Sequence, residues 1–257
     1  MGSAARLVRG EQQKQIVKLI EGMAGRRSAW EIWQDFIVMS ALAISNSVDR
    51  ENRETREREY MKRAEQYTRE ELEKFPAMLA LTVDAMEENP DQDFLGDLFM
   101  SLGLGDQWKG QFFTPYCICK AMAKLNSKEQ LEREIKEKGW ISVNDPACGA
   151  GALLLAFANE TRERGINYQE KVLFVCQDID YLAGMMCYIQ LSLLGCPGYV
   201  VIGDTLAHPG TSLDERGLLP RPGKNVWKTP MFFRDCWAWR QIFSAGGKHS
   251  EQTEKYA

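Results

Sequence analysis

The segment from Asn144 to Gly151, Asn-Asp-Pro-Ala-Cys-Gly-Ala-Gly, has the residue types in this sequence best suited to bind a ligand. It stands between a short apolar run and a helical one, so we expect a turn from a strand into a helix. The glycines at its end let the backbone turn tightly and approach a ligand closely. Asp145 is expected at the carboxyl end of the strand, in the crevice where open α/β sheets bind ligands, and a carboxylate there can pair with the amino group of an amino-acid moiety.

A dinucleotide site is the competing interpretation of the same segment. It would require the spacing G-x-G-x-x-G, but Leu154 stands where the third glycine belongs. A purely structural turn would explain the glycines but not the Asp-Pro pair ahead of them. The segment therefore favours a ligand site that does not bind a dinucleotide.

A second acid follows the next apolar run, Val172–Cys176. At this place Asp178 is predicted to accept hydrogen bonds from the two ribose hydroxyls of a nucleoside. Ile179 is predicted to pack on the face of the nucleobase, and Asp180 is expected to cap the helix that begins at Tyr181.

A third acid follows the third apolar run, in Gly203-Asp204-Thr205-Leu206. Asp204 is predicted to accept a hydrogen bond from the amino group of an adenine, with Thr205 and Leu206 as further contacts. Clustered carboxylates repel one another, so three acids at one edge of a sheet are hard to explain by stability alone.

The elements that would position these acids alternate regularly. Short apolar runs alternate with helical ones, which predicts an α/β fold with a parallel sheet and right-handed crossovers; the runs are Trp140–Val143, Gly151–Asn159, Val172–Cys176, Leu182–Leu194 and Tyr199–Ile202. After Asp204 the frequent prolines and glycines indicate a long loop.

The segment from Glu11 to Leu102 is predicted to be helical. Ser28 is expected to cap a helix beginning near Trp30 that is apolar on nearly all faces and therefore central in a bundle. Arg50–Arg69 carries alternating charges and is expected to be a solvated helix. A nucleic-acid-binding arm is the alternative, but the interleaved acids weaken its field.

Two further helices are expected in this region, one starting after Thr68 and one over Asp91–Leu102. The predicted organisation is therefore a helical region over residues 1–109 followed by an α/β domain over residues 110–257. Near its end, Trp237, Trp239 and Phe243 could form a stacking platform for a base, but we expect them to close an edge of the sheet.

The composition limits the classes of partner. The 257 residues carry 32 basic and 36 acidic side chains, a net charge of -4. Such a chain has no general attraction for a polyanion, so we expect only weak binding to DNA, through a local basic patch or a partner. The longest apolar stretch, Trp30–Ile44, contains charged residues and is too short to span a membrane.

The seven cysteines and two histidines show no zinc-site spacing, so no metal is expected. Cys117 and Cys119 are predicted to be small apolar residues of a helix rather than a metal or redox motif. Unpaired cysteines and the lack of a secretory signal at the start of the sequence predict a cytoplasmic protein.

Together these motifs resemble the N6-adenine DNA methyltransferases, and among them the modification subunits of type I restriction-modification systems. The resemblance covers roughly Asp93 to Leu206 and includes Gly110-Gln111-Phe112-Phe113-Thr114-Pro115, which looks like the amino-terminal cofactor motif of that family. The order, with a helical region ahead of the core, also matches. It implies a Rossmann-like core that binds S-adenosylmethionine.

The resemblance also implies roles for individual residues. It implies that the methionine end of the cofactor is flanked by Phe112, Phe113, Thr114 and Pro115 and lies above Asp145, Ala147, Gly149 and Gly151, and it adds Gln111 as a cofactor-binding residue. It supports Asp178 as the ribose contact and Asp204 as the adenine contact.

One family feature is missing. The family places Asn-Pro-Pro and an aromatic residue after the fourth strand, where they hold the target adenine, and this sequence has no Asn-Pro-Pro. The nearest counterpart is Thr229-Pro230-Met231-Phe232, after a predicted short strand Val226–Lys228. We therefore expect a degenerate catalytic motif at Thr229, Pro230 and Phe232, since a hydroxyl cannot replace a planar amide.

The sequence ends at Ala257, before the strands that complete a methyltransferase sheet, which suggests a fragment or a shortened relative. Three functions follow as hypotheses. The first is methyl transfer to adenine in DNA. The second is a non-catalytic cofactor-binding module or structural partner of an active methyltransferase, acting with a partner subunit or as a homo-oligomer. The third is methylation of a protein or a small molecule.

Overall fold

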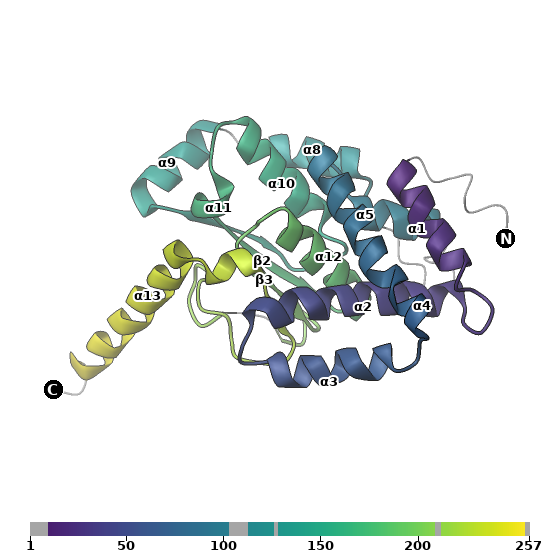
Figure 1. Cartoon of the computed structure of the whole chain (residues 1–257). Coiled ribbons are helices and arrows are strands. Elements are labelled where there is room, and N and C mark those ends of the chain that lie inside the picture. Colours follow the sequence, from purple (N-terminus) through teal and green to yellow (C-terminus); the bar gives the residue numbers. More distant parts are fainter. Residues whose placement is uncertain (1–9, 103–112, 126–127, 209–211, 255–257) are drawn as a thin grey trace.

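The computed structural model describes residues 10–102, 113–125, 128–208 and 212–254. A small β-sheet lies beside a group of N-terminal helices, and the C-terminal helix α13 (Asp235–Glu254) runs away from the body (Figure 1). This arrangement confirms the predicted α/β fold with a helical N-terminal region.

The sheet has the strand order β1-β2-β3-β4. Its strands are β1 (Ile141–Asp145), β2 (Val172–Asp178), β3 (Gly198–Ile202) and β4 (Val226–Lys228). The first three are parallel, as predicted. The fourth runs antiparallel to β3, pairing Val201 with Val226 and Tyr199 with Lys228. The direction of β4 is therefore opposite to that of the other three strands.

Helices α10 (Ala152–Glu163) and α11 (Tyr168–Lys171) connect β1 to β2, and α12 (Tyr181–Leu193) connects β2 to β3. Two further helices, α8 (Tyr116–Lys124) and α9 (Lys128–Lys138), precede β1. The predicted cap of α12 is confirmed, because the Asp180 carboxylate accepts a hydrogen bond from the Ala183 N–H at 2.8 Å.

The N-terminal helices are α1 (Glu11–Glu21), α2 (Ala29–Val48), α3 (Arg53–Ala64), α4 (Arg69–Leu72), α5 (Lys74–Glu88) and α6 (Phe94–Ser101). The predicted starts at Ser28 and Thr68 are confirmed, and each residue forms a capping box with a glutamate three residues later. As predicted, α2 is central: it packs against α1, α3 and α5, and also against α12 of the sheet layer.

One apolar core serves both parts of the chain. A single cluster of buried side chains runs from Ile16 in α1 to Trp227 in β4. The helical region is thus packed onto the sheet layer. The predicted domain boundary at residues 109 and 110 lies outside the described residues.

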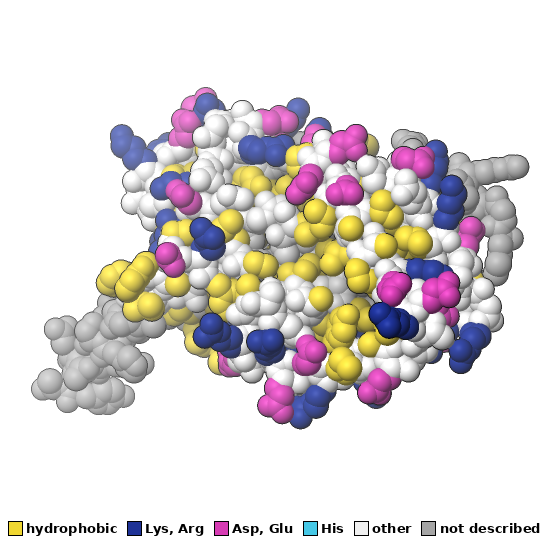
Figure 2. Space-filling model, viewed as in Figure 1, with side chains coloured by type: hydrophobic (Ala, Val, Ile, Leu, Met, Phe, Trp, Pro, Cys, Tyr) yellow, Lys and Arg dark blue, Asp and Glu magenta, His cyan; other side chains and the backbone are white. Residues whose placement is uncertain are grey.

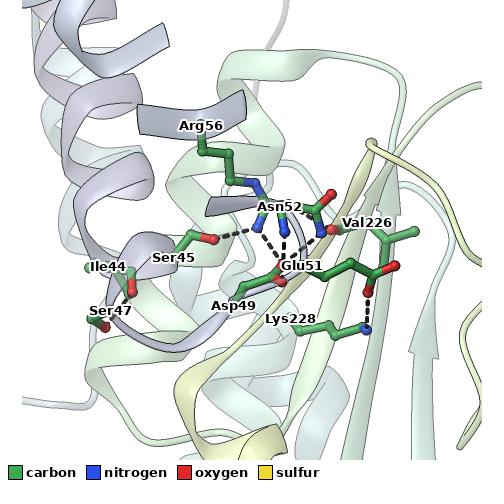
Figure 3. Close-up of polar contacts among 9 residues, drawn as sticks. All are labelled: Ile44, Ser45, Ser47, Asp49, Glu51, Asn52, Arg56, Val226 and Lys228. Carbon is green, nitrogen blue, oxygen red and sulfur yellow. Dashed lines mark hydrogen bonds and ion pairs between the residues drawn. The ribbon is translucent and has the colours of Figure 1, made fainter. Parts of the chain in front are cut away.

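Helix α3 departs from the prediction of a solvated helix at one residue. Acidic and basic side chains are interspersed over the face shown in Figure 2, but Arg56 of α3 is buried, with 5% of its side chain exposed. Its guanidinium donates to Asp49 at 2.6 Å, to the Ser45 hydroxyl, and to the Val226 carbonyl of β4 at 2.9 Å (Figure 3). Arg56 therefore joins the α2–α3 turn to the edge strand of the sheet.

A second buried polar group links α6 to the sheet layer. The Asp93 carboxylate accepts hydrogen bonds from the Gly96 N–H at 3.0 Å and from Gln190 Nε2 at 2.8 Å. Gln190 Nε2 also donates to the Ala150 carbonyl at 2.9 Å. Helix α6 is thereby connected through α12 to the turn after β1.

This buried acid predicts a specific pH dependence of stability. Burial raises the pKa of Asp93 from 3.8 to about 6. The folded state then holds a proton that the unfolded state has released, so stability falls as the pH rises from about 4 to 6 and stays lowered above that. A pKa shift of this size corresponds to a loss of about 3 kcal/mol in the free energy of unfolding. An Asp93→Asn variant keeps the acceptor oxygen without the charge, so its stability should not fall over this pH range.

Urea unfolding of both proteins at several pH values between 4 and 7 measures the difference. Asp84→Asn, at an exposed position of α5, is the control and should follow the pH profile of the natural protein. Parallel profiles for the natural protein and Asp93→Asn would show that Asp93 ionises normally.

The aromatic residues near the end of the chain separate into two groups. Trp237 is fully buried, packs edge-on against Trp140 with ring centroids 5.5 Å apart, and donates from Nε1 to the Gln169 carbonyl. It belongs to a buried cluster with Leu173, Val175 and Tyr199 and therefore covers a face of the sheet, where an edge position was expected. Trp239 and Phe243 are exposed and stack on each other, so the expectation that they close an edge of the sheet is wrong.

The cysteines follow the prediction with one exception. Cys119 is buried, but Cys117 is exposed on the outer side of α8. No helix among the described residues is both long and apolar enough to cross a membrane.

Candidate functional site

The candidate site lies at the carboxyl ends of β1 and β2. The two strands are parallel, so Asp145 and Asp178, their last residues, come to the same edge of the sheet. A pocket of about 360 Å³ opens there, and both carboxylates line it. The structure thus brings together the two acids that the sequence singled out first.

The turn after β1 forms one wall of this pocket. Gly149 has φ +53° and Gly151 has φ +94°, a region that other residues rarely adopt. A Cβ atom on Gly149 would lie 3.1 Å from the ring of Phe113, and one on Gly151 would lie 2.9 Å from Cys187 Sγ. The turn therefore needs glycine at both positions, for backbone conformation and for packing.

Four of the five N–H groups between Ala147 and Gly151 have partners within the protein. Four N–H groups donate to protein oxygens: Ala147 to Asp145 Oδ1 (3.1 Å), Cys148 to the Gln177 carbonyl (3.0 Å), Gly149 to Asp178 Oδ2 (2.7 Å) and Gly151 to the Cys148 carbonyl (2.8 Å). A phosphate-binding loop instead presents its N–H groups to the ligand. With most of its N–H groups engaged within the protein, this turn is poorly suited to hold a pyrophosphate.

The charges of the pocket also disfavour a pyrophosphate as its ligand. Among the described residues, its lining contains the carboxylates of Asp145 and Asp178 and no lysine, arginine or histidine. Burial raises the pKa of Asp145, the Ala147 N–H opposes this, and the nearby Asp178 carboxylate raises the pKa further. A cationic group on a ligand would relieve this repulsion, whereas a phosphate would increase it.

Asp178 has a structural role as well as a place in the pocket. Its two oxygens accept hydrogen bonds from the N–H groups of Gly149, at 2.7 Å, and Asp180, at 2.8 Å. A carboxylate can accept about four hydrogen bonds. Asp178 can therefore hold the glycine turn and still accept from a ligand.

The amino-terminal motif reaches the pocket in part. Phe113 and Thr114 line it, whereas Pro115 stands at the start of α8 and does not. Gln111 and Phe112 lie outside the described residues. Ala147 and Gly149 line the pocket as well, and Gly151 begins α10 behind it.

The structure does not bring the remaining candidates into the pocket. Asp204 lies on the same edge of the sheet, but its carboxylate accepts from the N–H groups of Leu206, at 2.8 Å, and Ala207, at 3.2 Å, in a local turn. The Thr205 hydroxyl donates to the Pro146 carbonyl at 2.6 Å. Ile179 and Leu206 are 70% and 93% exposed. Their roles as ligand contacts stay predictions.

The expected counterpart of the catalytic motif is in the wrong place. Because β4 is antiparallel, Thr229 follows it at the edge of the sheet opposite to Asp145 and Asp178. Thr229 is buried, and its hydroxyl donates to the Cys196 carbonyl at 2.7 Å and accepts from the Gly198 N–H at 3.1 Å.

The two residues that accompany Thr229 are also structural. Pro230 starts a short 3₁₀ helix (Pro230–Phe233), and Phe232 is buried against Tyr199. The prediction that Thr229, Pro230 and Phe232 stand where the catalytic motif belongs is therefore wrong, and the direction of β4 is the reason.

Several pocket residues were not predicted as ligand contacts. They are Cys119 and Met122 of α8, Cys148 and Ala150 of the turn, Ala152 and Leu153 of α10, and Ala183 of α12. Cys119 and Met122 are three residues apart on a helix, a spacing that places them on one face. This spacing is the one feature of the sequence that could have indicated these two residues. It does not distinguish a helix face that lines a pocket from one that packs in the protein core.

Comparison with known proteins identifies the family. Searches against curated proteins and solved structures gave no match. The family model described as N-6 DNA methylase matches residues 102–244, which include the turn after β1 and the ends of β1, β2 and β3. The narrower resemblance to type I modification subunits stays a prediction. The match covers more than half of the chain and agrees with the fold, and the protein therefore belongs to the N-6 DNA methylase family.

Proposed function

We propose that this protein binds S-adenosylmethionine in the pocket at the ends of β1 and β2, as the cofactor of methyl transfer to adenine in DNA. The observation that supports this proposal is the composition of the pocket. The described residues that line it include two carboxylates and no cationic side chain. Most N–H groups of the adjoining turn donate to oxygens of the protein itself. S-adenosylmethionine has an ammonium and a sulfonium group against a single carboxylate, and no phosphate, so it is a net cation, which suits the charges of this pocket.

The residues present fit the parts of this cofactor. Asp145 would pair with the ammonium group, and Asp178 would accept from the ribose hydroxyls. Ile179, exposed beside Asp178, offers an apolar surface for the adenine ring. When bound, the cofactor supplies an electrophilic methyl group, and the part of the pocket is to hold and orient it.

Removing the proposed ribose contact should weaken binding. Asp178→Ala is expected to reduce the affinity for S-adenosylmethionine by about 1.5–3 kcal/mol, the range for a hydrogen bond to a charged group. Titration calorimetry measures the change. Asp180→Asn is the matched control, because Asp180 caps α12 and an asparagine keeps that cap.

The two possible failures have different meanings. An unchanged affinity of Asp178→Ala would remove only the ribose role of Asp178. The absence of both heat and thermal shift for the natural protein at millimolar cofactor would contradict the proposal itself.

A second candidate function is a non-catalytic cofactor-binding module that acts with an active methyltransferase subunit or as a homo-oligomer. The observation that favours it is the position of Thr229 at the edge of the sheet opposite to the pocket. In this function the chain binds the cofactor, and the group that holds the acceptor base comes from elsewhere. An assay of methyl transfer to DNA distinguishes the two functions.

A further inference from the structure

We propose that a basic groove beside β4 binds the phosphate backbone of double-stranded DNA. The groove has a volume of about 420 Å³ and lies between the α2–α3 turn (Glu51, Asn52) and the segment Pro220–Lys228. The choice of DNA rests on membership of the N-6 DNA methylase family. The groove is separate from the pocket that holds the proposed cofactor.

The charge of the groove is opposite to that of the whole chain. Arg221, Lys224 and Lys228 line it, against the single carboxylate of Glu51, although the net charge of the chain is -4. Arg221 and Lys224 are exposed, whereas Lys228 Nζ lies 3.8 Å from Glu51 Oε2. Two side chains are thus available to neutralise phosphates, which is the dominant source of affinity for DNA.

The surface next to the groove carries mixed charge. Arg50 and Arg53 are exposed on either side of Glu51 and Asn52 in the chain, but they line a neighbouring pocket together with Glu54, Glu57 and Glu65. Of the described residues that line the groove, none is a large exposed apolar side chain of the kind that anchors a membrane-binding surface. Exposed cations without apolar anchors match a phosphate backbone rather than a membrane surface.

The two walls of the groove are held together from beneath. Arg56 donates to the Val226 carbonyl in one wall and to Asp49 in the other (Figure 3). Its guanidinium carbon lies 4.0 Å from the centre of the Trp227 ring. A buried ion pair of this kind needs both partners in place. The groove is therefore formed before a ligand arrives, which lowers the entropy cost of binding.

The groove also lies next to the carboxyl ends of the parallel strands, where the pocket opens. Asn225, the neighbour of Lys224, donates from Nδ2 to the Ile202 carbonyl at 2.8 Å. Next along the edge, the Gly203 N–H donates to the Asp178 carbonyl at 2.9 Å. DNA bound in the groove would lie beside the edge at which the pocket opens, as a protein that acts on DNA with a bound cofactor requires.

Charge reversal tests this proposal. Fluorescence anisotropy with a labelled 20-base-pair duplex at about 50 mM salt should give binding that weakens as salt rises. We expect Arg221→Glu with Lys224→Glu to weaken binding by at least about tenfold and to reduce the slope of log Kd against log salt by about 1.8. Arg221→Gln with Lys224→Gln should have a smaller effect in the same direction.

The control has the same change in net charge at another place. Arg133→Glu with Lys136→Glu alters an arginine and a lysine that are exposed on α9. Helix α9 packs on β1, at the other side of the sheet from β4. This variant should bind DNA with an affinity within about threefold of the natural protein, because the Debye length at this salt is only about 14 Å.

Three results would overturn the proposal: no binding of duplex DNA by the natural protein, equal losses in the groove and control variants, or a groove variant that loses binding to phosphatidylserine vesicles but not to DNA. Calorimetry with S-adenosylmethionine should give the same affinity for the groove variant as for the natural protein, which also shows that the variant is folded. A natural protein that binds DNA through the groove but does not bind the cofactor would contradict only the proposed function.

Discussion

Gly149→Val should abolish S-adenosylmethionine binding while the protein stays folded. Gly149 has φ +53°, where a β-branched side chain is strained. Its Cβ atom would lie 3.1 Å from Phe113 on the wall of the pocket. Relief of this strain moves the N–H that donates to Asp178 and fills the path of the ligand. We expect an affinity at least about a hundredfold lower, the combined effect of strain and a lost charged hydrogen bond.

Calorimetry measures the affinity, and circular dichroism and thermal unfolding report on the fold. Gly165→Val is the matched control: Gly165 has φ +80°, with nothing within 4 Å of an added Cβ atom, and it follows α10 far from the turn. It carries the same kind of backbone strain and should still bind. If folded Gly149→Val retains cofactor binding, the assignment of the pocket is wrong.

Gly151→Val is a less informative variant. Its Cβ atom would lie 2.9 Å from Cys187 Sγ and 3.4 Å from Cys187 Cα, in the buried contact between α10 and α12. We expect this substitution to disturb the fold as well as the site. Loss of binding by it would therefore not separate the two effects.

The chain by itself should transfer methyl groups to DNA adenine at a rate about a hundredfold to a thousandfold below that of an intact family member. Loss of one preorganised polar group that stabilises the reacting atoms typically has an effect of this size. The sequence contains no Asn-Pro-Pro, and its nearest counterpart begins with Thr229, at the edge of the sheet opposite to the pocket. The measurement is tritium transfer from labelled cofactor to adenine-rich duplexes, with the intact family member as the control.

The structure also predicts that repairing the motif in place will fail. Thr229→Asn with Met231→Pro should not raise the rate, because residue 229 stays at the wrong edge. It should lower stability, since the fully buried Thr229 hydroxyl bonds to Cys196 and Gly198. Rapid turnover by the natural chain, or a gain in rate from this variant, would mean that the segment Thr229–Phe232 does reach the reacting atoms.

Much of the fold was predictable because its signals are local. The alternation of apolar runs with helical ones gave β1, β2 and β3 and the helices between them, and the caps at Ser28, Thr68 and Asp180 marked helix starts. A cap is a contact between residues three positions apart, so it is visible in the sequence. The glycine turn after β1 was predictable for the same reason.

The candidate site was only partly predictable. Asp145 and Asp178 could be paired from the sequence, since the carboxyl ends of adjacent parallel strands share an edge. Asp204 follows the same rule, but its carboxylate is engaged by the N–H groups of its own turn. Whether an acid faces a ligand or its own backbone depends on loop conformation, which the residue types do not specify.

By itself, the sequence determined the parallel strands, the helix starts and the pairing of two acids beside a glycine turn, because each depends on residue periodicity or on neighbours along the chain. Only the tertiary structure decided the direction of β4 and the burial of Arg56. A strand of three residues is too short for its pattern to specify a direction. Arg56 looks like any charge of a solvated helix until Val226, 170 residues away, supplies its partner. The antiparallel pairing of β4 with β3 places Thr229 at the end of the sheet opposite to the pocket. The hydrogen bond from Arg56 to Val226 joins the two walls of the basic groove.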